Sequence, residues 1–248
     1  MEENIKILIV EDMPADAELN MREARKVLGK CEFEVVEREE DFLNALIHFK
    51  PHIILSDYTM PEFDGLSALR LAIENAPDVP VIMVTGSINE DTAVECIQAG
   101  AVNYVIKQSI KRLGSAIIHA LEERQRKLDY RKAQADLIES EKRYRSLFEL
   151  SPVGIVVQDS ESNIVHVNET YCTISGYSSS ELLGKNIDFL AGSQIAESII
   201  DNRRRILSGE ILKHEVVNVR KDGTEMIIEL SESAITLSDG STGILSIA

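Results

Sequence analysis

The sequence has no tryptophan and only three cysteines among its 248 residues. Cys31, Cys96 and Cys172 lie too far apart to form a metal-binding or CxxC motif, so we expect reduced thiols, as in cytosolic proteins. No apolar run comes near the length of a membrane-spanning helix, and the acidic N-terminus lacks the apolar core of a signal peptide. These absences predict a cytoplasmic protein without a membrane anchor.

Basic residues are also scarce. There are 26 Lys and Arg against 42 Asp and Glu, which gives a net charge of −16 at pH 7. This surplus of negative charge argues against nonspecific binding to nucleic acids or anionic membranes, and no basic DNA-binding module is visible. Residues 126–145 are the exception, with seven Lys and Arg against four Asp and Glu. We therefore expect two acidic domains, 1–125 and 146–248, joined by a basic connector.

Residues 1–125 alternate short apolar runs with amphipathic segments. The apolar runs predict strands at residues 5–10, 33–36, 53–55, 79–85 and 101–106. The amphipathic segments predict helices at residues 16–28, 39–49, 67–75 and 90–99. This alternation indicates βαβ units and one parallel sheet. Five such strands suit a flavodoxin-like, doubly wound α/β fold with strand order 2-1-3-4-5.

Polar side chains stand at the carboxyl ends of four of these strands: Glu11 and Asp12, Asp57, Thr85, and Lys107. In the predicted order the first and third strands are neighbours, so the three carboxylates would meet at one edge of the sheet. Carboxylates that close repel one another unless a cation neutralises them, and an all-oxygen ligand set favours Mg²⁺ or Mn²⁺. Asp57 could then act as a nucleophile that forms an acyl phosphate, while Thr85 and Lys107 bind phosphoryl oxygens.

The motifs that carry these residues resemble those of response-regulator receiver domains from two-component systems. They are ILIVED at residues 7–12, DYTMPEFDG at 57–65, VTG at 84–86 and YVIK at 104–107. The resemblance implies that Asp57 accepts a phosphoryl group from the phosphohistidine of a cognate histidine kinase. It also implies that Mg²⁺ is bound by Glu11, Asp12, Asp57 and the backbone carbonyl of Thr59.

The same resemblance implies that Thr85 and Tyr104 form a switch pair. The hydroxyl would turn toward the phosphate, and the aromatic ring would move inward behind it, while Lys107 would contact the phosphoryl group. The sequence departs from the family pattern at two positions. Gln108 follows the lysine where the family usually has proline, and Gly86 follows Thr85 where alanine is frequent. The first departure leaves the geometry of the loop after the fifth strand open.

The connector is predicted to be one long helix over residues 112–147, because it contains no proline and no glycine after Gly114. Part of this helix has mostly apolar residues, with one serine among them, at alternating spacings of three and four. We call this set the seam; its members are Tyr130, Ala133, Leu137, Ser140, Tyr144 and Leu147. Such spacing is typical of a coiled-coil dimer. The alternatives are a helix that packs on its own domain and a simple linker.

Residues 146–248 follow a different pattern. Strands are predicted at residues 154–158, 164–168, 213–220, 225–233 and 243–247, and helices at 169–175, 179–183 and 194–207. Asp222 and Gly223 form a hairpin turn between two of the strands. Two strands, then helices, then three hairpin-connected strands indicate an α+β domain with an antiparallel sheet.

This block resembles a PAS domain. The matching segments are RYRSLFE at residues 143–149, SPVGI at 151–155, VNE at 167–169, SGYS at 175–178, ELLG at 181–184 and KDGT at 221–224. Flavin-photoreceptor PAS domains carry an NCRFLQ motif that is missing here, and the predicted helix 194–207 has no histidine to bind haem. The sequence therefore argues against a flavin adduct and against haem, and it leaves the PAS ligand open.

These features lead to one main hypothesis. Asp57 receives a phosphoryl group, and the helical connector relays the change to a PAS sensor and dimerisation domain in a homodimer. On this hypothesis the segment catalyses only its own phosphorylation and dephosphorylation. PAS domains usually continue past the final strand, so we expect a C-terminally truncated PAS domain and a longer signalling protein. The alternative is the regulatory front part of a hybrid histidine kinase or nucleotide cyclase with its catalytic module beyond residue 248.

Overall fold

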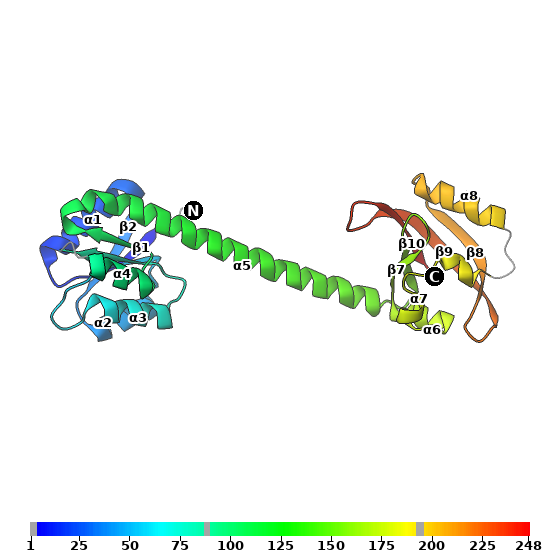
Figure 1. Ribbon diagram of the computed structural model, residues 1–248, viewed down its shortest axis with the longest axis horizontal. Helices are drawn as coiled ribbons and strands as arrows, with labels where there is room; N and C mark the ends of the chain where they lie inside the picture. The colour runs from blue at the N-terminus through cyan, green and yellow to red at the C-terminus, as the bar shows by residue number, and fades with distance from the viewer. Residues whose placement is uncertain (1–3, 87–89, 192–195) are drawn as a thin grey trace. The chain divides into compact units, whose positions relative to one another are not determined.

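The computed structural model of the chain describes residues 4–86, 90–191 and 196–248. It divides into two compact units, Met1–Gln134 and Ala135–Ala248. The first unit is built on a five-stranded parallel sheet (Figure 1). Its strands are β1 (Ile5–Val10), β2 (Cys31–Val36), β3 (Ile53–Asp57), β4 (Val81–Thr85) and β5 (Asn103–Ile106). Their order, β2-β1-β3-β4-β5, confirms the predicted flavodoxin-like fold.

Helices cover both faces of this sheet, as Figure 1 shows. One face packs against α1 (Pro14–Leu28) and the first turns of α5 (Leu113–Glu149). The opposite face packs against α2 (Glu39–His48) and α3 (Gly65–Asn75). The remaining helix, α4 (Glu90–Gln98), precedes β5. The first unit thus has the three layers expected of a doubly wound fold.

The two central strands are the most deeply buried part of the unit, because every residue of β3 and of β4 is buried. Alternate side chains enter opposite cores: Ile54 packs toward α2 and α3, whereas Leu55 packs toward α1 and α5. Burying an aliphatic side chain of this size contributes about 2 kcal/mol relative to leaving it exposed. The carboxyl ends of these strands are therefore held firmly in place.

Several elements of the first unit begin or end up to two residues from their predicted bounds. Helix α3 begins at Gly65 because Asp64 caps it, with its Oδ1 accepting a hydrogen bond from the Ser67 N–H at 2.9 Å. After β5, a 3₁₀ helix (Lys107–Arg112) leads directly into α5. Gln108 thus lies in a helical turn, and no cis peptide bond occurs among the described residues.

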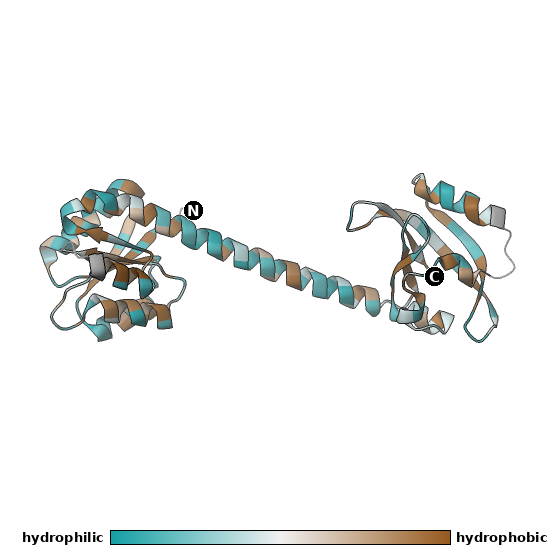
Figure 2. Ribbon diagram, viewed as in Figure 1, coloured by the Kyte–Doolittle hydropathy of each residue, from teal (hydrophilic) through white to brown (hydrophobic). Residues whose placement is uncertain are grey.

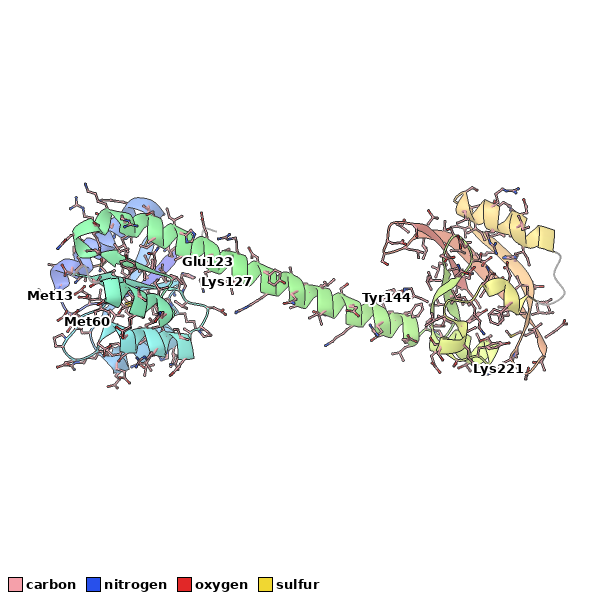
Figure 3. All side chains as sticks on the ribbon, in the orientation of Figure 1. Met13, Met60, Glu123, Lys127, Tyr144 and Lys221 are labelled. Carbon is pink, nitrogen blue, oxygen red and sulfur yellow. The ribbon has the colours of Figure 1, made fainter. Side chains whose placement is uncertain are left out.

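Helix α5 confirms the predicted long helix to within two residues at its C-terminal end. One side of its first turns is buried against the sheet, but all side chains from residue 129 to 147 are exposed. Figure 2 shows this exposed stretch as mostly hydrophilic with scattered apolar residues. Ion pairs one turn apart support the helix, such as Glu123 with Lys127 at 3.6 Å, both labelled in Figure 3. Arg124 and Arg131 also contact Asp78 in the loop before β4.

The second unit confirms the predicted α+β domain with an antiparallel sheet. Its strands are β6 (Ile155–Gln158), β7 (Ile164–Val167), β8 (Leu212–Val219), β9 (Glu225–Thr236) and β10 (Thr242–Ile247), arranged in the order β7-β6-β10-β9-β8. The helices are α6 (Glu169–Ser175), α7 (Ser179–Leu182), a 3₁₀ turn (Ile187–Leu190) and α8 (Ala196–Leu207). Gln194 and Ile195, the first residues of the predicted helix 194–207, lie outside the described residues.

Two residues stabilise the connections between elements of this unit. Gly223 adopts a φ of 84°, which suits it to the predicted turn between β8 and β9. Asn168 caps α6 by accepting a hydrogen bond from the Tyr171 N–H, and its side-chain amide donates to the carbonyl of Phe148 in α5. In the part of the chain that the structure describes, no helix is long and apolar enough to cross a membrane.

Candidate functional site

The carboxyl edge of the parallel sheet brings together the acidic residues that the sequence singled out. Glu11 and Asp12 directly follow β1, and Asp57 is the last residue of the adjacent strand β3. Each of these three side chains offers a carboxylate oxygen, and the three oxygens lie within 4.8 Å of one another. Glu11 and Asp57 are buried, whereas Asp12 is half-buried. This spacing suits a single cation with oxygen ligands.

Lys107 follows β5 and reaches across the edge to these carboxylates. Its Nζ lies 2.8 Å from Asp57 Oδ2 and 2.9 Å from Glu11 Oε2. A third contact, 2.5 Å to Asp16 Oδ2, was not predicted from the sequence. Asp16 belongs to the first turn of α1, and an acidic residue there is a common helix-start feature, so its sequence position did not point to the site.

The charges at this edge are unbalanced. Burial raises the pKa of Glu11, and the nearby charge of Asp57 adds to that effect, while the hydrogen bond from Lys107 lowers it. Burial also lowers the pKa of Lys107, but the hydrogen bonds to Asp16, Asp57 and Glu11 outweigh burial and raise it. Lys107 is therefore a permanent ammonium ion at neutral pH. One ammonium faces four carboxylates, so a divalent cation would improve the balance.

The chemistry of the donor set fits Mg²⁺ better than a softer metal. All the candidate side-chain ligands are carboxylate oxygens, and no histidine or cysteine belongs to the cluster. The backbone N–H of Thr59 donates to Asp57 Oδ1 at 3.3 Å, which holds this residue close to the carboxylate. The backbone N–H of Met13 donates to Glu11 Oε1 at 3.2 Å, which fixes the other carboxylate; Met13 is labelled in Figure 3.

The loop between β3 and α3 passes very close to Asp57. The Gly65 N–H donates to the carbonyl oxygen of Tyr58 at 3.2 Å, which folds the loop back onto the strand end. A Cβ atom added to Gly65 would lie only 2.2 Å from the backbone oxygen of Asp57. Met60, also labelled in Figure 3, is buried and anchors the same loop in the core. Glycine at position 65 is therefore a steric requirement for the site.

The two residues proposed as a switch pair occupy different environments. Thr85 ends β4 and is buried, so its hydroxyl lies at the same sheet edge as Asp57. Tyr104 on β5 is 41% exposed, so its ring is not packed into the core. Gly86 follows Thr85 in an open position, where an added Cβ would meet no atom within 4 Å.

The second unit contains a cavity of about 90 Å³ between α8 and the inner face of its sheet. A chain of hydrogen-bonded side chains lines one wall. Gln158 Nε2 donates to Ser246 Oγ at 3.0 Å, and Ser246 Oγ donates to Glu232 Oε1 at 2.5 Å. The other oxygen of Glu232 lies 2.8 Å from His214 Nε2, and Nδ1 of that ring lies 3.3 Å from Asn202 of α8. The sequence did not predict this series of hydrogen-bonded side chains, because its members come from five separate elements.

The cysteine and tyrosine of α6 belong to the core next to this cavity. Tyr171 lines the cavity, and burial raises its pKa to about 12. Burial also raises the pKa of Cys172, so this thiol stays protonated at neutral pH and is a poor nucleophile. His166 on β7 is exposed.

Comparisons with known proteins match each unit separately. A family model described as response regulator receiver domain matches residues 7–118, and one described as PAS domain matches residues 152–248. Chemotaxis protein CheY from Listeria monocytogenes is 33% identical over 106 residues, which cover 42% of this chain and 86% of that protein.

Two further relatives extend the comparison. The bacterioopsin transcriptional activator from Halobacterium salinarum is 26% identical over 187 residues, covering 72% of this chain. The chain spans only 28% of that protein's length. The crystal structure of a PAS domain from an HTR-like protein of Haloarcula marismortui is 31% identical and matches with a TM-score of 0.44. This match covers 47% of the present chain and 96% of the Haloarcula marismortui chain.

Proposed function

We propose that phosphorylation of Asp57 controls the protein, because the chain belongs to the response-regulator receiver family over residues 7–118 and carries a PAS domain over residues 152–248. The donor would be the phosphohistidine of a cognate histidine kinase. The observation that carries this proposal is the buried carboxylate of Asp57, which lies among Glu11, Asp12 and the ammonium of Lys107. In this role the segment carries out only its own phosphorylation and dephosphorylation.

The proposed reaction is a displacement at phosphorus. An oxygen of the Asp57 carboxylate forms a bond to phosphorus as the bond from phosphorus to the donor breaks, and the donor leaves with that electron pair. Glu11, Asp12, Asp57 and the backbone carbonyl of Thr59 would hold Mg²⁺, which supplies charge screening for the incoming phosphoryl group. Lys107 exchanges its hydrogen bond to Asp57 Oδ2 for one to a phosphoryl oxygen, and the Thr85 hydroxyl donates to another.

We expect the change at Asp57 to leave the site through Thr85 and Tyr104. Movement of the Thr85 hydroxyl toward the phosphoryl group would open space behind it on β4. The ring of Tyr104, which is now partly exposed on the neighbouring strand β5, would fill that space. The 3₁₀ helix and α5 follow β5 directly in the chain, so they would carry the change toward the PAS domain.

The proposal predicts a magnesium-dependent acyl phosphate. We expect incubation with acetyl phosphate and Mg²⁺ to add one phosphoryl group, seen in the intact mass of the protein. Chelation of the metal with EDTA should reduce the initial rate by about 100-fold or more, because the clustered carboxylates repel the donor without a cation. Hydroxylamine should remove the group, since it cleaves acyl phosphates and not phosphoserine. Labelling that is equal with and without metal would contradict the proposal.

We also propose that the protein forms a homodimer through the seam of α5. Tyr130, Leu137, Tyr144 and Leu147 are each between 59% and 71% exposed in the single chain, although all are apolar or aromatic. They repeat at the spacing of a two-stranded coiled coil, and a second copy of the same helix would bury them.

The dimer is tested by charge placement on the helix. Leu137→Glu places a carboxylate in the seam, and it should weaken dimerisation at least about tenfold, measured by sedimentation equilibrium. Ala135→Glu adds the same charge to the opposite side of α5 and should leave the dimer intact. A monomeric wild-type protein at the same concentrations would exclude the seam as an interface.

A further inference from the structure

Asp16 is the one carboxylate near Lys107 that the proposed chemistry leaves without a role. Its Oδ2 lies 2.5 Å from Lys107 Nζ, the shortest of the three contacts made by that ammonium. Asp16 does not belong to the group of carboxylates close enough to share a metal ion. It comes from the first turn of α1, whereas the candidate ligands come from strand ends.

We propose that Asp16 is a positioning residue that holds the Lys107 ammonium beside Asp57 throughout phosphoryl transfer. The proposal rests on the phosphorylation of Asp57 described above. Asp16 would contact neither the metal nor the phosphoryl group, and it would act only through Lys107.

Every donor of the Lys107 ammonium is already in use. An ammonium group has three N–H donors, and here Glu11, Asp16 and Asp57 each accept one. Two of these partners would have other tasks during the reaction. Asp57 becomes an acyl phosphate, so its donor passes to a phosphoryl oxygen, and Glu11 would help to hold the cation. Asp16 alone can keep the same bond before and after the transfer.

The rest of the surroundings favours such a role. The lysine side chain is 18% exposed and the Asp16 side chain 36%, so water screens this pair only in part. A flexible lysine loses side-chain entropy when it is held in one place. Because Asp16 already holds Lys107 before the reaction, less of this entropy has to be lost during phosphoryl transfer. Helix α1 itself is fixed against the sheet by the buried residues Ala17 and Ala24, so Asp16 sits on a rigid support.

The test compares Asp16→Ala, Asp16→Asn and the control Glu18→Gln. Glu18 is an exposed acid on the same helix and pairs with Arg25, so its replacement removes a charge of the same sign without touching Lys107. We expect Asp16→Ala to slow phosphorylation by acetyl phosphate about tenfold, on the order of one charge-assisted hydrogen bond that is partly screened. Asp16→Asn should fall in between, and Glu18→Gln should match the wild type.

Three further readouts separate positioning from other roles. Calorimetric Mg²⁺ affinity and the urea midpoint of Asp16→Ala should stay close to those of Glu18→Gln. A tenfold loss of Mg²⁺ affinity would make Asp16 a metal ligand and overturn the proposal. In a Lys107→Ala background, Asp16→Ala should have no further effect on the rate; a full additional tenfold loss would show that Asp16 does not act through Lys107.

The same experiments distinguish this inference from the proposed function. If the wild type gains no phosphoryl group, the phosphorylation of Asp57 fails. If the wild type is labelled and Asp16→Ala reacts at the rate of Glu18→Gln, only the role of Asp16 fails. Asp16→Glu keeps the charge on a longer side chain and should recover part of the rate, which a purely steric effect at this position would not produce.

Discussion

Replacing Asp57 with asparagine is expected to abolish phosphoryl transfer, with incorporation from acetyl phosphate falling at least about 100-fold. An amide oxygen is a poor nucleophile, and the neighbouring carboxylate of Glu11 cannot take over without losing its place. Glu11 is fixed by the Met13 N–H and by Lys107, and it is almost completely buried. Loss of the nucleophile therefore removes the covalent step rather than weakening it.

The matched control for this variant is Glu62→Gln in the loop that follows β3. Glu62 is exposed and its one described ion pair, with Arg38, is long at 3.8 Å. Its replacement removes one negative charge, as Asp57→Asn does, and it should leave labelling unchanged. Intact-mass measurement of both variants with acetyl phosphate and Mg²⁺ decides the matter. Equal labelling of Asp57→Asn and wild type would exclude Asp57 as the acceptor.

Replacing Gly65 with alanine should destabilise the receiver unit by about 2–3 kcal/mol and sharply slow phosphorylation. The added Cβ would lie 2.2 Å from the backbone oxygen of Asp57 and 2.9 Å from the Cα of Tyr58. Both of these atoms belong to the backbone at the end of β3, which is buried between two cores and cannot move aside cheaply. The loop must therefore shift, and it carries Thr59 away from the Asp57 carboxylate.

Gly86→Ala provides the matching control. The substitution is chemically identical and lies at the end of the adjacent strand, but the added Cβ would meet no atom within 4 Å. Urea unfolding followed by circular dichroism should give a lower midpoint for Gly65→Ala only. Indistinguishable midpoints for the two variants would show that the loop tolerates a side chain at position 65.

The strand order and the meeting of Glu11, Asp12 and Asp57 were predictable because both follow from local patterns. Continuous apolar runs mark strands that are buried on both faces, and the residue after such a run lies at the carboxyl edge. The pattern does not encode which side chains reach that edge from a helix. Asp16 is four residues from Asp12 in the chain, yet only the packing of α1 brings it to Lys107.

The hydrogen-bonded side chains of the PAS cavity could not be predicted from the sequence. Gln158, Asn202, His214, Glu232 and Ser246 are separated by long stretches of chain, and each one alone is an ordinary polar residue. Their hydrogen bonds depend on the antiparallel register, which places Ser246 opposite Glu232 on neighbouring strands. Sequence periodicity predicts that a residue is on a strand, but not which residue faces it across the sheet.

Lys107 stabilises the acidic edge of the receiver unit when no metal is bound. Its ammonium bridges Glu11, Asp16 and Asp57, so the unit carries an internal counter-ion for its own acidic edge. An incoming divalent cation must compete with that ammonium for Glu11 and Asp57. We therefore expect the edge to stay folded when magnesium is withdrawn. The magnesium concentration would then set how readily Asp57 reacts, without changing the native structure.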